Sequence, residues 1–140
     1  MKITRIETVR PAAPATVIFV RVITEDGFAG LGETWFGPET VEAEIHARLA
    51  PQLLGQNATM IPELTRRMRP YVGAWGSGAE MRALSAVNIA LWDLAGKRAQ
   101  CPLYDLLGGR VRDSIPTYNT CAGPDYVSTT SDVRPENFNQ

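Results

Sequence analysis

The sequence predicts an α+β fold in which a three-stranded antiparallel meander is followed by a helical bundle. Residues 16–24 are β-branched at most positions, which is typical of a strand. The Asp26-Gly27 pair that follows suits a tight hairpin, because glycine adopts positive φ at no steric cost. From Pro38 onward, apolar residues recur every three or four positions, which is the period of amphipathic helices.

The sequence pattern indicates the three strands with different clarity. Residues 2–10 alternate imperfectly between apolar and polar, and Pro11 and Pro14 then end any pairing. Residues 16–24 are apolar on both faces except at Arg21, which predicts a strand that is covered on both sides. Residues 28–34 return antiparallel after the turn.

Three helices and a helical turn follow. Pro38 suits a first helical position, and the helix that it opens is expected to end at residues 51–55. A second helix is expected from Ile61. The strongest helix is expected over residues 79–98, where alanines beside the apolar face permit close packing. Residues 102–109 predict a short turn closed by glycine, and residues 111–120 predict a further extended segment without visible sheet partners.

Composition excludes several classes of function. The chain has 140 residues, a formal net charge of −1 and no long apolar run, so nucleic acid and membranes are not expected as partners. We therefore expect a cytoplasmic protein. Cys101 and Cys121 are not in a metal-ligand spacing and are expected to be reduced thiols.

Residue chemistry alone predicts no active site. Glu42 and His46 stand four positions apart on the first helix and could share one ion, but a solvated helix face is the favoured interpretation. The glycine-rich residues 73–78 match neither nucleotide-binding fingerprint.

Three loops suggest a ligand nevertheless: residues 11–15, the Trp35-Phe36-Gly37 corner and the loop around Trp75. Aromatic side chains flanked by Gly and Pro often cover small-molecule sites. The alternative is that Trp35 and Trp75 fill the core, and the pattern leaves both interpretations open.

Longer motifs carry a resemblance to a known family. They are GFAGLGE at residues 27–33, ALSAVNIALWDLAGK at 83–97, PLYDLLGG at 102–109 and IPTY at 115–118. In this order, the chain resembles the mandelate racemase and muconate lactonizing branch of the enolase superfamily. The resemblance covers residues 1 to about 120.

The resemblance implies two domains with different roles. Residues 1–113 would form an N-terminal capping domain, and residues 114–140 would hold the first strand of a (β/α)7β barrel and the loop after it. In this family the barrel carries the ligands of an essential Mg2+ and the bases that remove a proton α to a carboxylate. None of those positions lies in this chain, so no catalytic or metal-binding residue is assigned here.

The resemblance does imply substrate contacts for the cap. Loops after its first and third strands would close over the substrate, which makes Trp35 and Phe36 candidate binding residues. Tyr118 and Asn119, at the end of the first barrel strand, are candidates for the pocket floor.

We therefore hypothesise that the chain is the capping part of a Mg2+-dependent lyase or isomerase. The enzyme would act on a carboxylate such as an acid sugar, by dehydration or racemisation. Its expected partners are the C-terminal barrel domain and further copies of itself. A second interpretation stays open: a stand-alone, non-enzymatic α+β binding or assembly module that uses the same loops.

Overall fold

The computed structural model describes residues 1–69 and 78–117. Residues 1–109 form one compact unit, and a second unit begins at Arg110. The first unit contains an antiparallel sheet in the order β1-β2-β3, with β1 at Ile3–Val9, β2 at Val17–Thr24 and β3 at Ala29–Trp35. The predicted meander and the α+β fold class are confirmed.

One face of the sheet carries the core. Along β2, alternate residues are buried, with Ile18, Val20 and Val22 all 0% exposed. On the other face, Val17, Phe19 and Ile23 are only half-buried and Arg21 is exposed. The prediction that β2 is covered on both sides is therefore wrong for the described residues, because the helices of this unit pack against a single face.

The first helical segment is continuous but not uniform. It consists of α1 (Pro38–Glu44), a π-helical turn (Ile45–Leu49) and α2 (Ala50–Leu53). Pro51 lacks an N–H and cannot donate within a regular α-helix, and a wider turn precedes it. The four large side chains of this segment that are 0% exposed recur every four residues, which drifts by about 40° per step on a regular α-helix; they are Val41, Ile45, Leu49 and Leu53. The wider turn offsets that drift and keeps them on one face.

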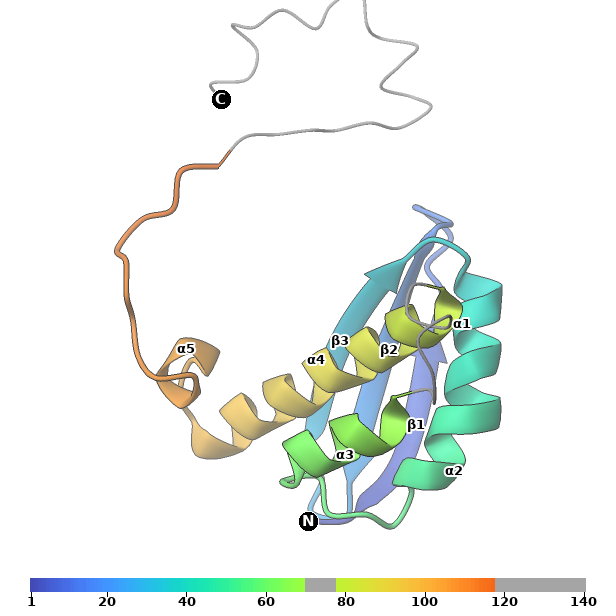
Figure 1. The fold of residues 1–140 in the computed structure, drawn as a ribbon, viewed down its shortest axis with the longest axis horizontal. Coiled ribbons are helices and arrows are strands. Elements are labelled where there is room, and N and C mark those ends of the chain that lie inside the picture. The colour runs from blue at the N-terminus through green and yellow to red at the C-terminus, as the bar shows by residue number, and fades with distance from the viewer. Residues whose placement is uncertain (70–77, 118–140) are drawn as a thin grey trace, which may run out of the picture. The chain divides into compact units, whose positions relative to one another are not determined.

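Helix α4 (Ala79–Ala99) crosses the sheet and packs on β3 and β2 (Figure 1). A Cβ atom built on Gly32 would lie 1.9 Å from the Ala86 carbonyl oxygen, and one on Gly30 would lie 1.9 Å from that of Ala90. The helix backbone therefore rests directly on the backbone of β3. Only glycine on the strand permits this approach, and alanine on the helix contributes to it.

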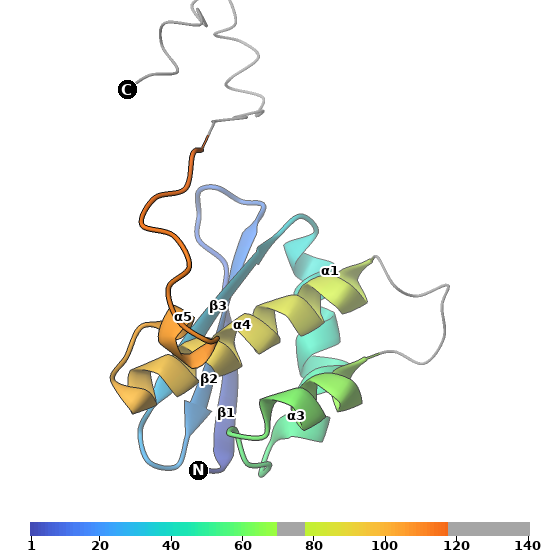
Figure 2. The same ribbon diagram turned by 60° about the vertical axis from the view of Figure 1, so that its left-hand side comes forward.

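The remaining helices are short. Helix α3 (Ile61–Met68) lies beside α4 in both ribbon views (Figures 1 and 2), and Asn88 of α4 donates a hydrogen bond to the Thr65 hydroxyl over 2.8 Å. Helix α5 (Leu103–Leu106) follows α4. Residues 110–117 form no helix or strand. A strand needs a partner to pair with, so the first barrel strand expected from Ile115 stays a prediction.

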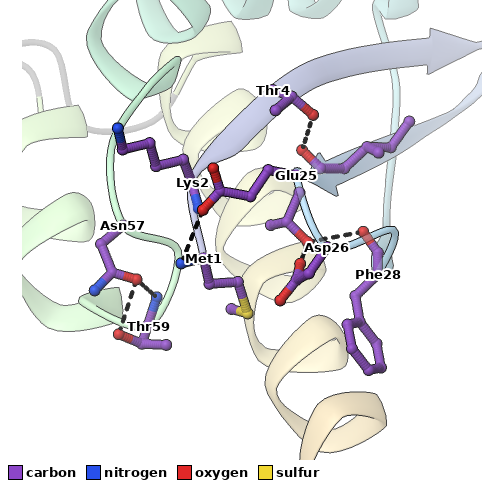
Figure 3. A network of polar contacts seen from close by, with 10 residues as sticks. Met1, Lys2, Thr4, Glu25, Asp26, Phe28, Asn57 and Thr59 are labelled. Carbon is purple, nitrogen blue, oxygen red and sulfur yellow. Dashed lines mark hydrogen bonds and ion pairs between the residues drawn. The ribbon is translucent and has the colours of Figure 1, made fainter.

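At the hairpin end of the sheet, polar contacts fasten the start of the chain (Figure 3). The Glu25 carboxylate accepts a hydrogen bond from the Lys2 backbone N–H over 2.9 Å and lies 3.3 Å from the amino group of Met1. These contacts, the Lys2 N–H first, lower the pKa of Glu25. The pKa of Asp26 is also lowered, chiefly because its carboxylate accepts from the Thr24 hydroxyl. The opposite end of the sheet holds the loop between β1 and β2 and the corner after β3.

Candidate functional site

At that opposite end, the two loops expected to approach a ligand lie together. Val17 pairs with Trp35 across β2 and β3. The Phe36 N–H donates a hydrogen bond to the Thr16 carbonyl oxygen over 2.8 Å. The β1–β2 loop, residues 11–15, therefore ends beside the corner between β3 and α1. Nothing in the local sequence pattern predicts this hydrogen bond, because it joins segments that meet only in the folded sheet.

The corner has an unusual backbone. Phe36 has a φ of 74° and Gly37 a φ of 68°, so two consecutive residues are left-handed. For phenylalanine this conformation costs on the order of 1 kcal/mol or more. Contacts on both sides hold it: the bond to Thr16 before the corner, and after it the Gly37 carbonyl, which accepts from the Thr40 hydroxyl over 2.8 Å. The chain turns sharply here into α1.

Both aromatic side chains of the corner face outward. Trp35 is 63% exposed and Phe36 is 58% exposed. The alternative that Trp35 fills the core is therefore wrong. The two rings meet edge to face, with centroids 6.0 Å apart and an interplanar angle of 71°. They offer an apolar surface at the loop end of the sheet.

A positive charge lies on this surface. The guanidinium carbon of Arg82, in the first turns of α4, lies 5.2 Å from the centroid of the Phe36 ring. That distance is within the range of a cation–π contact. The sequence gives no sign of this role for Arg82, because no local motif links it to the corner and only the crossing of α4 over the sheet brings the two together.

Ionic contacts border the corner. The Arg10 guanidinium lies 2.6 Å from the Glu39 carboxylate and 3.4 Å from that of Glu42. Arg10 leads into the β1–β2 loop, whereas both glutamates are on α1. These ion pairs connect the stem of the loop to the helix that the corner opens.

Glu42 and His46, which were considered as a shared ion site, both contact the hydroxyl of Thr8 instead. The Thr8 hydroxyl lies 2.7 Å from the Glu42 carboxylate and 2.8 Å from His46 Nε2. A carboxylate can only accept, so the hydroxyl donates to Glu42 and accepts from the His46 N–H. Within residues 1–69 and 78–117, no three His, Cys, Asp or Glu side chains are placed to hold a metal ion. The described residues therefore do not fit a magnesium site.

Hollows in the surface lie elsewhere. One of about 560 Å3 lies between β3 and the C-terminal half of α4, and is lined by Leu31, Asp93 and Cys101 among others. Two more, of about 440 and 350 Å3, lie between α3 and α4 and share Ile61 and Trp92. None of these three is lined by Trp35 or Phe36.

Of the predicted site residues, Trp35 and Phe36 come together here. Tyr118 and Asn119, and the loop around Trp75, lie outside the described residues. No helix in the described part of the chain combines the length and the apolar character that a membrane span requires.

The chain has a meander covered on one face by helices, with the β1–β2 loop and the corner after β3 together at one end. This is the α+β N-terminal domain of enolase-superfamily enzymes. Residues 4–108 match the family model described as mandelate racemase / muconate lactonizing enzyme, N-terminal domain. The chain belongs to that family.

Individual relatives agree with this assignment. The chain is 39% identical to a D-galactonate dehydratase family member from Paenibacillus sp. (strain JDR-2), over 94% of its own length and 33% of that protein. It matches an enolase of the mandelate racemase subgroup from Agrobacterium tumefaciens with a TM-score of 0.82 and 45% identity, over 94% of this chain and 37% of that one. It matches a racemase from Streptomyces coelicolor with bound magnesium with a TM-score of 0.70 and 37% identity, over 77% and 34%. The chain thus spans about a third of the length of each relative.

Proposed function

We propose that this chain is the substrate-capping domain of a Mg2+-dependent acid-sugar dehydratase. The observation that carries the proposal is the paired exposure of Trp35 and Phe36 on a corner fixed by backbone hydrogen bonds and ion pairs. An exposed aromatic pair on a held backbone can bury a ligand without first being ordered. Family membership and the name of the Paenibacillus relative support an acid sugar as that ligand.

In this proposal, the chain contributes binding and exclusion of water. The apolar faces of Trp35 and Phe36 would pack over the carbon skeleton of the acid, and water removed from the site would strengthen every polar contact to the substrate. The described residues do not fit a magnesium site, so the proposal assigns the metal and the bases to the part of the protein that corresponds to the rest of the relatives. Racemisation, self-association and a cytoplasmic location stay predictions from the sequence.

Turnover by the complete protein that carries this chain tests the proposal. Purified protein is incubated with Mg2+ and a panel of six-carbon aldonates, with D-galactonate first. Loss of water from a 2,3-dihydroxy acid leaves a 2-keto-3-deoxy acid, which is detected by its carbonyl group. Formation of that product from at least one acid is expected. Failure with every acid, with no exchange of the α-proton for solvent deuterium, would contradict the proposal and favour the stand-alone binding module.

A further inference from the structure

Arg82 connects the exposed corner to helix α4. Three residues that follow it on α4, Ala83, Ala86 and Val87, are 0% exposed and belong to the hydrophobic core. Arg82 itself is half-buried, and its guanidinium lies over the Phe36 ring at 5.2 Å. The helix that carries Arg82 cannot shift easily, because its backbone rests on Gly30 and Gly32 of β3. The backbone that carries Arg82 is therefore firmly placed, and its guanidinium lies above a corner whose aromatic side chains face solvent.

The aromatic side chains of the corner need a contact that fixes their direction. The backbone of Phe36 is held by the Thr16 carbonyl, but a hydrogen bond at the N–H does not fix the direction of the ring. Trp35, in turn, meets Phe36 edge to face. A chain of contacts thus runs from Arg82 to Phe36 to Trp35, and each member restricts the next.

We propose that Arg82 is a positioning residue for the aromatic corner: by stacking on Phe36 it fixes the orientation in which Trp35 meets the substrate. The effect of Arg82 on substrate rests on the proposed function, whereas the series of contacts from Arg82 through Phe36 to Trp35 does not. Arginine suits this role because its planar guanidinium stacks on an aromatic face and stays charged at every physiological pH. Lysine keeps the charge but not the plane, so Arg82→Lys should restore only part of the effect.

The contact chain is tested by NMR on the full 140-residue chain. The indole N–H signal of Trp35 is identified by its loss in Trp35→Phe, and its heteronuclear NOE reports side-chain order. Arg82→Gln should lower this NOE clearly, Phe36→Leu should lower it to a similar extent, and the double variant should lower it no further. Arg98→Gln, at the other end of α4, is the matched control and should leave it unchanged. An unchanged NOE in Arg82→Gln, with the melting temperature preserved, would overturn the proposal.

Kinetics of the complete protein test the consequence for substrate. Arg82→Gln should raise KM for a turned-over acid sugar at least threefold and change kcat less than twofold, with partial recovery in Arg82→Lys. In a Phe36→Leu background, where the ring that Arg82 stacks on is already absent, Arg82→Gln should raise KM no further. Fully additive effects would mean that Arg82 contacts the substrate itself, and they would overturn the positioning role. If the unaltered protein turns over no acid sugar, the proposed function fails, and the NMR result alone decides whether Arg82 orders the corner.

Discussion

Asp93 on α4 accepts a hydrogen bond from the backbone N–H of Leu31 on β3, over 2.7 Å. The same carboxylate lies 2.7 Å from Lys97 Nζ, and Lys97 donates to the carbonyl oxygen of Ala29 over 3.1 Å. The strand β3 is an edge of the sheet, where alternate backbone groups have no neighbouring strand. The two side chains therefore pair with backbone groups that would otherwise stay open to another chain.

Removing the acceptor should weaken the domain. We expect Asp93→Ala to lower the free energy of unfolding by about 1 to 2 kcal/mol, because the Leu31 N–H and Lys97 both lose a charged partner. Asp93→Asn keeps an acceptor oxygen and should lose less than half as much. Urea unfolding of the two variants measures the difference. A stability of Asp93→Ala equal to that of the unaltered chain would show that solvent replaces the carboxylate at no cost.

The close approach of α4 to β3 predicts a severe effect at Gly32. In Gly32→Ala the new methyl group would lie 1.9 Å from the Ala86 carbonyl oxygen, so the helix must move away from the strand. We expect a loss of about 3 kcal/mol. The matched control is Gly78→Ala, whose methyl group meets only the end of the flexible Glu80 side chain and should cost under about 1 kcal/mol. Similar melting temperatures for the two variants would contradict the packing described here.

Stability should fall in acid partly through Glu63. Its carboxylate accepts hydrogen bonds from Arg66 and Arg67 at 2.8 to 2.9 Å, and these bonds, Arg66 first, lower its pKa from 4.5 to about 2. Because the folded state favours the charged form, this contribution is complete above about pH 4.5 and disappears as the pH falls toward 2. The contribution is small, since the group is exposed. An NMR titration of the Glu63 carboxyl carbon with a midpoint near 4.5 would refute the pairing, and Glu63→Gln should flatten stability over this range.

The chain by itself should not bind Mg2+ specifically. Octahedral Mg2+ needs convergent oxygen ligands, and the described residues hold no suitable group of side chains. Calorimetric titration of the 140-residue chain should therefore show no saturable binding at micromolar Mg2+. A stoichiometric site would place metal chemistry within this chain and overturn the assignment of the metal elsewhere.

Local patterns sufficed to predict most elements of the fold. The first strand follows from an imperfect alternation, the second from a β-branched run and the third from the Asp26-Gly27 turn before it, and the helices follow from apolar spacing. Such signals are contained in neighbouring residues, so they survive without knowledge of the tertiary structure. The wider turn before Pro51 and the single covered face of β2 were not predicted, because each depends on what packs against the segment.

The candidate site could be predicted only in part. The Trp35 corner stands out by its composition, but whether it faced the core or solvent could not be decided from sequence. Arg82 carries no local signal at all. The four-residue spacing of Asp93 and Lys97 suits an ion pair on one helix, but it does not indicate that both side chains bond the edge of β3. In each case the missing information is a contact between residues far apart in the chain.

Trp35 is proposed to cover the substrate, and replacing its side chain tests that role. In the complete protein, Trp35→Ala should lower kcat/KM for an accepted acid by a factor of ten or more, which is about 1.4 kcal/mol per tenfold. The melting temperature should change little, because the side chain is 63% exposed. Leu91→Ala is the control: Leu91 is 0% exposed, so its truncation should cost about 2 to 5 kcal/mol of stability and leave the kinetics of the folded fraction near normal.

The decisive measurement is therefore kcat/KM beside the melting temperature of Trp35→Ala, for two acids of different length. We expect a preserved melting temperature and a loss of kcat/KM that differs between the two acids, since each fills the space under the indole differently. A large fall in melting temperature with unchanged kinetics on both acids would contradict it and make Trp35 a structural residue.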